Sequence, residues 1–213
     1  MSRRIPLVAG IVFAVLFTVA LLMVPTLPGT DQPASAVVSH LRDHAHALRV
    51  QALLLTLGFL ALAIVLAYAR SRLDGPAGYA FTIGSALIIA EFSVELWFTG
   101  GLALHAASLD PVVARTVADL ALMFGPILTV ADVIVAVPIV LGAKAGRFPR
   151  WLGVLAAVFA FEQFVETVTI IGAPGAFISP GGPMNMFLGG ALFIVFFLAL
   201  GVSAARLPDP APA

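Results

Sequence analysis

Long hydrophobic runs dominate the chain, and polar residues gather in short segments between them. A helix needs roughly 20 apolar residues to cross a bilayer, and six runs reach that length. The sequence therefore predicts an all-α, polytopic membrane protein: a six-transmembrane-helix bundle of one domain, residues 1–206, followed by a disordered tail, 207–213. The expected spans are residues 5–27, 48–69, 77–99, 112–143, 151–171 and 183–205.

Three segments depart from a simple pattern of perpendicular spans. The run 112–143 is too long for one, so it either tilts or begins as a surface helix. Pro126 within it cannot donate a hydrogen bond to the carbonyl of Leu122, which predicts a kink. An amphipathic helix is expected from about Ala34 into the second span. Residues 172–187, "GAPGAFISPGGPMNMF", are rich in glycine and proline and predict an irregular lid.

The basic residues indicate an orientation. Eight of the eleven fall on the side of the N-terminus, namely Arg3, Arg4, Arg70, Arg72, Lys144, Arg147, Arg150 and Arg206. Arg42, Arg49 and Arg115 fall on the other side. The positive-inside rule then predicts that both termini are cytoplasmic, in a multi-pass protein of the inner (cytoplasmic) membrane.

The first run also resembles a secretory signal, because Arg3 and Arg4 precede an apolar stretch that is followed by "PASA". Its length favours an uncleaved anchor, since the apolar part of a signal peptide has about 7–15 residues.

The amino-acid composition excludes several kinds of partner and site. Charged residues make up only 10% of the chain, and its formal net charge is +0, so no nucleic-acid partner is expected beside the lipid bilayer. Cysteine is absent, which excludes disulfides, thiolate metal sites and cysteine nucleophiles. The sequence also contains no phosphate-binding glycine loop and no Gly-x-Ser-x-Gly motif.

Two spans that run in the same direction carry matched pairs of carboxylates. Glu91 and Glu95 lie in "AEFSVELW", and Glu162 and Glu166 lie in "FEQFVETV". A spacing of four places each pair on one helix face. At 1.5 Å per residue, both pairs lie about 6–13 Å below the outer ends of their helices. Asp119 falls in the outer third of the fourth span, and Asp132 falls about 20 Å further towards the cytoplasmic half.

Four ionised carboxylates in one dry pocket would repel one another strongly. Protonation, pairing with arginine or histidine, or a bound cation would each relieve this repulsion. The favoured hypothesis is a site for a cation or proton, with a divalent metal as one possible ligand, that serves binding or transport in the outer half of the bundle. Glu91, Glu95, Glu162 and Glu166 would supply the charge, and Asp119 would assist.

His40 and His44 would cap or gate this site. Two histidines four apart on a helix can share a metal ion, and imidazole with carboxylate suits several divalent metals. A solvated polar helix face is the simpler interpretation of the same spacing. Asp132 could extend a polar path inwards, although no complete transmembrane path is evident.

Two other classes of function are compatible with the same residues. In a non-catalytic accessory or structural subunit, the acids would form a packing network with Arg42, Arg49 or Arg115, helped by Gln51. In a metal-dependent membrane enzyme, carboxylate and histidine ligands would activate a water molecule. No catalytic motif supports the enzyme, so no catalytic residue is assigned.

The order of segments resembles a group of six-span bacterial membrane proteins of unknown function that are common in actinobacteria. The matching stretches are "HLRDHAHALRVQALL", "YARSRLDG" and "GRFPRWLGVLA". The resemblance implies a six-helix bundle in the cytoplasmic membrane and carries no activity. The resemblance does not assign the paired glutamates to the general pattern of this group, and they would mark a subgroup.

Overall fold

The structure is a computed structural model that describes residues 4–206, and this part of the chain is helical, with no strand. The predicted disordered tail, 207–213, and Arg3 lie outside the described residues. The helices are α1 (Arg4–Met23), α2 (Ala34–Arg70), α3 (Gly75–Leu104), α4 (Pro111–Leu122), α5 (Phe124–Lys144), α6 (Arg150–Glu166), the 3-10 helix η1 (Thr167–Ile171), the π-helix η2 (Met184–Gly189) and α7 (Gly190–Arg206).

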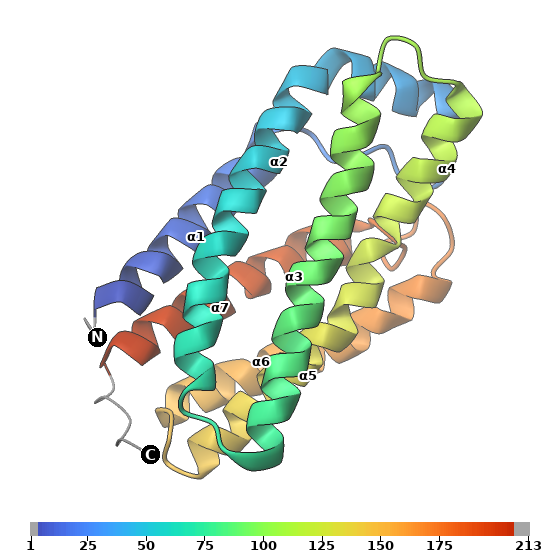
Figure 1. Ribbon diagram of the computed structural model, residues 1–213. Helices are drawn as coiled ribbons and strands as arrows, with labels where there is room; N and C mark the ends of the chain where they lie inside the picture. The colour runs from blue at the N-terminus through green and yellow to red at the C-terminus, as the bar shows by residue number, and fades with distance from the viewer. Residues whose placement is uncertain (1–3, 207–213) are drawn as a thin grey trace.

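Six of the resulting segments are long and apolar enough to cross a membrane, because α4 with α5, α6 with η1, and η2 with α7 each act as one span. The predicted fold class, an all-α bundle of six membrane spans, is confirmed. Each helix packs against the next around a closed ring, in the order α1, α2, α3, α5, α6, α7 and back to α1 (Figure 1).

The two ends of the bundle differ in their connections. We call the end with residues 24–33, 105–110 and 172–183 the distal end, and the end with residues 71–74 and 145–149 the proximal end. Arg4 and Arg206 both lie at the proximal end. The sequence predicts that the proximal end is cytoplasmic.

Large apolar side chains cover both the inside and the outside of the ring. Phe13, Phe159 and Phe197 are fully buried in its centre, whereas Leu22 and Trp97 are 81% and 71% exposed. A helix that is apolar on all sides is expected where its outer face meets lipid. The exposed apolar side chains therefore indicate the lipid-facing surface.

The helix α2 begins at Ala34, as predicted, and its first turns lie across the distal end before the helix enters the ring (Figure 1). These turns cover a second set of buried residues, separate from the main core, which we call the distal cluster. Its members are Val24, Val37, Val38, Leu41, Leu48, Leu102, Ala103, Ala106, Ala114 and Ala118. The Arg42 guanidinium donates to the carbonyls of Ala106 and Ala107, at 3.3 Å each, and fastens α2 to the α3–α4 connection.

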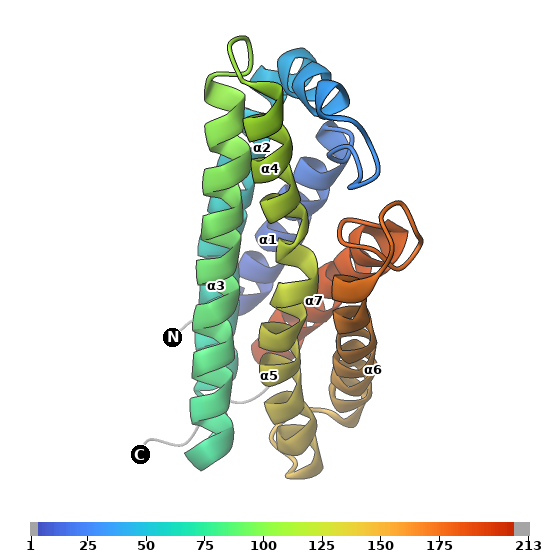
Figure 2. The same cartoon turned by 90° about the vertical axis from the view of Figure 1, so that its right-hand side faces the viewer.

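The fourth span is broken, as the proline predicted. The α-helix stops at Leu122 and resumes at Phe124, with Met123 between the two parts. Because Pro126 has no N–H, it cannot bond to the carbonyl of Leu122. The helix α4 packs against α2 and α3, whereas α5 packs between α3 and α6 (Figure 2).

The lid, residues 172–187, consists of turns and bends up to Pro183 and then enters η2. It lies beside the junction of α4 and α5 rather than at the extreme distal end (Figure 2). Gly181 of the lid sits against the side chain of Leu122, the last residue of α4. The position of the lid brings Asn185 into the bundle, and this determines the polar site described next.

Candidate functional site: a carboxylate-lined cavity

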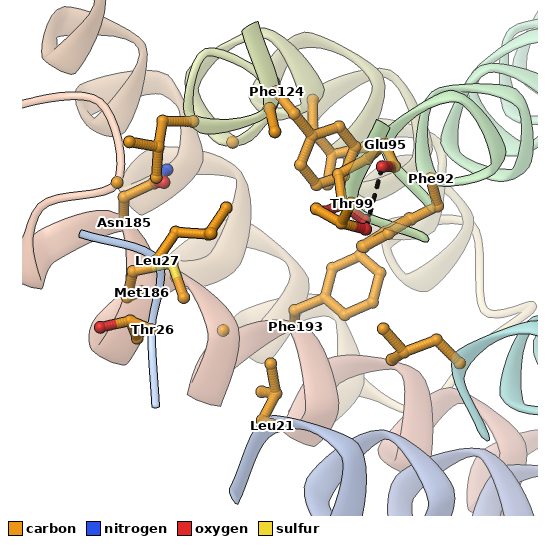
Figure 3. Close-up of a pocket in the computed structure, with 18 of the residues that line it drawn as sticks. Leu21, Thr26, Leu27, Phe92, Glu95, Thr99, Phe124, Asn185, Met186 and Phe193 are labelled. Carbon is orange, nitrogen blue, oxygen red and sulfur yellow. Dashed lines mark hydrogen bonds between the residues drawn. The ribbon is translucent and has the colours of Figure 1, made fainter. Parts of the chain in front are cut away.

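A cavity of about 200 Å³ separates the central phenylalanine core from the distal cluster. Its walls come from α1, α2, α3, α4, α5, α6, η2 and α7, and from the segments next to α1 and η2. Val24 and Leu48 contribute to both the cavity wall and the distal cluster. The polar residues that line the cavity are Thr26, Gln51, Glu95, Thr99, Asp132, Gln163, Glu166 and Asn185, several of which appear in Figure 3.

Asp132 occupies the middle of the acidic part of the site. Its side chain is 1% exposed, and its Oδ1 atom is buried without a hydrogen-bond partner. Its carboxyl group is close enough to those of Glu166, Glu91 and Glu162 for their charges to interact. We call these four residues the acid cluster. Asp132 can reach the acids of both neighbouring helices because α5 packs between α3 and α6.

The two glutamates of α6 are held by a side-chain amide. The Nε2 atom of Gln163 donates to Oε2 of Glu162 at 2.8 Å and to Oε2 of Glu166 at 3.2 Å. The three side chains are buried. The carboxyl oxygens of the two glutamates are only partly hydrogen-bonded, because Oε1 of Glu162 is buried without a partner.

The lid supplies a second amide. Nδ2 of Asn185 donates to Oε1 of Glu166 and connects η2 to the end of α6. Two glycines make room for this contact. A Cβ at Gly125 would overlap the amide of Asn185, and a Cβ at Gly189 would overlap the carboxyl of Glu166. A side chain at either position would therefore displace the amide of Asn185 or the carboxyl of Glu166 from this contact.

The two glutamates of α3 lie in different surroundings. Glu95 lines the cavity, and its backbone carbonyl accepts a hydrogen bond from the Thr99 hydroxyl at 3.2 Å. Glu91 belongs to the acid cluster and has a buried, unpartnered Oε2 atom. The matched pairs therefore do not simply face each other across a gap. Asp132, which the sequence placed apart from them, joins Glu91 to Glu162 and Glu166.

Asp119 lies away from the cavity. Its Oδ1 atom pairs with the Arg115 guanidinium at 2.5 Å, and neither residue lines the cavity wall. Arg115 also donates to the carbonyls of Pro28 and Gly29, at 3.3 and 3.1 Å. The pair thus fastens α4 to the α1–α2 connection, and Asp119 has no contact that would let it assist the acid cluster.

His40 and His44 lie close together on the first turns of α2. Their ring centroids are 4.7 Å apart, and Nδ1 of His44 is 2.9 Å from the carbonyl oxygen of His40. Neither ring lines the cavity, whereas Leu48, one turn further along α2, does. Across residues 4–206, no three His, Asp or Glu side chains are arranged to hold a metal ion.

The alternative in which arginines pair with the acids is seen for Asp119 alone, and none of the four glutamates forms an ion pair among residues 4–206. The ion pairs among residues 4–206 join Arg115 to Asp119 and Arg147 to Asp74. Arg49 is exposed, and Gln51 donates to the carbonyl of Ala20 at 2.8 Å. None of the described residues that line the cavity is lysine, arginine or histidine. The acid cluster therefore has amide partners but no counter-charge among these residues.

Sequence reasoning missed the two amides. Gln163 stands between Glu162 and Glu166, so its spacing was visible, although its side-chain direction was not. Asn185 lies between two methionines in the lid, where no periodicity indicates which side chain points inwards. The cluster of aromatic rings beside the acids was also not predicted, because these rings come from helices distant in sequence.

No protein-family model, curated protein or solved structure matches the chain, so the resemblance to six-span bacterial proteins stays a prediction.

Proposed function

We propose that the protein binds a cation at the acid cluster, as one step of a transport or sensing function in the bacterial cytoplasmic membrane. The observation that carries this proposal is the buried carboxyl of Asp132, which has an unpartnered oxygen and three acidic neighbours. A buried charge without a partner is strongly unfavourable. A cation or a proton bound at the cluster removes this penalty.

A proton needs no coordination shell and therefore suits the site better than a divalent metal, and monovalent cations are tested beside it. Magnesium and calcium require six or more oxygen ligands, and zinc usually requires four ligands. Within the described part of the chain, no three acidic or histidine side chains converge as metal ligands. The experiment below therefore compares monovalent and divalent cations.

Thermal unfolding of the purified protein tests the proposal. The protein would be studied in detergent, in a buffer whose only cation is the bulky N-methyl-D-glucamine, with Li⁺, Na⁺, K⁺, Mg²⁺, Mn²⁺ or Zn²⁺ added in turn. A ligand that binds only the folded state at 100 times its Kd stabilises that state by about 2.7 kcal/mol. We expect a monovalent ion, or acidification alone if the ligand is a proton, to raise the unfolding midpoint.

The matched variants are Asp132→Asn and Asp74→Asn. Asp74 pairs with Arg147 at the proximal end and is largely exposed, so its replacement should leave the response to cations unchanged. Asp132→Asn should abolish the response. If no ion and no pH change stabilises the protein, or if Asp132→Asn keeps the full response, the acids serve only as a packing network with Gln163 and Asn185.

A further inference from the structure

Four phenylalanine rings line the cavity and contact one another. The centroids of Phe92 and Phe193 are 5.4 Å apart, those of Phe92 and Phe124 are 4.8 Å apart, and those of Phe17 and Phe193 are 5.4 Å apart. We call these four rings the phenylalanine wall. Figure 3 shows Phe92, Phe124 and Phe193 around the same space as Glu95. The wall comes from α1, α3, α5 and α7 and is therefore formed only by the folded ring of helices.

The same cavity has an acidic side. Asp132, Glu166 and Glu95 line it, and none of its described lining residues is basic. Asp132 is the decisive member, because it is almost completely buried and its Oδ1 atom lacks a protein partner. A ligand that fills this space meets carboxylates and aromatic faces together.

We propose that the cation bound in the cavity is a small organic ammonium ion with an apolar body. This inference rests on the proposed function and names the class of its ligand. An ammonium group pairs with carboxylates and is also attracted to the faces of aromatic rings. Its alkyl groups gain free energy when they leave water for an apolar wall. A bare inorganic ion lacks this second contribution.

The dimensions of the cavity restrict the ligand to a compact ion. About 200 Å³ is less than the roughly 300–1,000 Å³ that pockets for drug-sized molecules enclose. On the distal side, the wall is formed by Pro25, Thr26 and Leu27 of the α1–α2 connection and by Gly181 of the lid. This part of the wall is therefore formed by irregular segments rather than by packed helices.

Choline and its uncharged isostere 3,3-dimethyl-1-butanol test the inference without any mutation. The two molecules have the same shape, and only choline carries the charge. Binding would be measured by calorimetry on the full chain in lipid nanodiscs, with empty nanodiscs as the reference for partition into lipid. We expect choline to bind at least about tenfold more tightly than the alcohol, a difference that one good charged contact supplies.

Substitutions test the phenylalanine wall and the acidic side of the cavity one at a time. Phe193→Leu removes one aromatic ring and should weaken choline binding by about three- to thirtyfold. Asp132→Asn removes a carboxyl group and should weaken choline binding more than Phe193→Leu does. Phe92→Leu gives a second test of the wall if Phe193→Leu does not fold. Phe164→Leu is the matched control, because this ring lies on α6 but is 69% exposed on the outer surface.

Each outcome of these measurements either supports or overturns the inference of an organic cation. Preferential binding of choline that depends on both Asp132 and the wall supports the inference. Binding of Na⁺, K⁺ or protons without choline overturns the organic ligand and leaves the proposed cation function intact. Equal binding of choline and the alcohol shows that charge plays no part and overturns the inference. The absence of binding by any cation overturns both proposals.

Discussion

Asp132 of α5 and Glu166 of α6 line the same cavity, because α5 and α6 pack side by side. Glu166 receives hydrogen bonds from Gln163 and Asn185, whereas Oδ1 of Asp132 has no partner. The site is therefore asymmetric: the protein's own amides hold one carboxyl in position, and one oxygen of the other is buried without a hydrogen-bond partner. The predictions below follow from this asymmetry and from the contacts around it.

Replacement of Asn185 by aspartate should release the lid. The change replaces the amide with a carboxyl group opposite Glu166, so the hydrogen bond that Nδ2 of Asn185 donates is lost. We expect faster hydrogen exchange in residues 172–189 of Asn185→Asp, measured by mass spectrometry. Gln32→Glu is the control, because the Gln32 amide also bonds a carboxylate, that of Asp31, but in solvent. Equal exchange in wild type and Asn185→Asp would show that this hydrogen bond does not hold the lid.

A methyl group at Gly125 should disturb the site without any change of charge. The added carbon would overlap the amide of Asn185, which must then move away from Glu166. We expect Gly125→Ala to lower both the unfolding midpoint and the affinity for the cation. Gly101→Ala, at a helical position with open space around it, should instead be neutral or stabilise the protein by about 0.5–1 kcal/mol. Similar midpoints in the two variants would contradict the close approach of α5 and η2.

Asp119 should prove structural. Its partner Arg115 fastens α4 to the carbonyls of Pro28 and Gly29, away from the acid cluster. Asp119→Asn should therefore leave the affinity for the cation unchanged and should lower the unfolding free energy by less than about 2 kcal/mol, measured by denaturant titration. A loss of affinity as large as that of Asp132→Asn would place Asp119 among the ligands after all.

The orientation in the membrane can be tested with single cysteines, since the chain has none of its own. Ser108 lies in the distal connection and Ala145 lies at the proximal end, and both are exposed. If the proximal end is cytoplasmic, a membrane-impermeant maleimide should label Ser108→Cys in intact cells and should label Ala145→Cys only after lysis. The opposite pattern would reverse the predicted topology.

The sequence was sufficient to predict the spans and the break in the fourth one. Apolar length and one proline determine these features locally, and the helix bounds agree within a few residues at most ends. Short connections join successive helices, and the helices accordingly lie around the ring in their order along the chain. The depths of the two glutamate pairs below their helix ends differ from the expectation, because α3 continues to Leu104, whereas Glu166 is the last residue of α6.

The composition of the site could not be predicted, because it depends on which helices are neighbours. Asp132 was expected to lie apart from the glutamates, whereas the position of α5 between α3 and α6 brings it among them. His40 and His44 were expected to cap the acids, but neither lines the cavity that Glu95, Asp132 and Glu166 line. Asn185 acts through an irregular segment in which no repeat indicates its direction.

The central claim is that the carboxyl of Asp132 binds a cation, and calorimetric titration tests it most directly. Wild type and Asp132→Asn would be titrated with a monovalent inorganic cation, with choline and with acid, in parallel and after their folded state has been verified by circular dichroism. We predict saturable binding of one of these ligands to wild type and at least about tenfold weaker binding to the variant, because a charge-assisted contact is lost. Equal binding by the two proteins, or no binding by wild type, would contradict the claim.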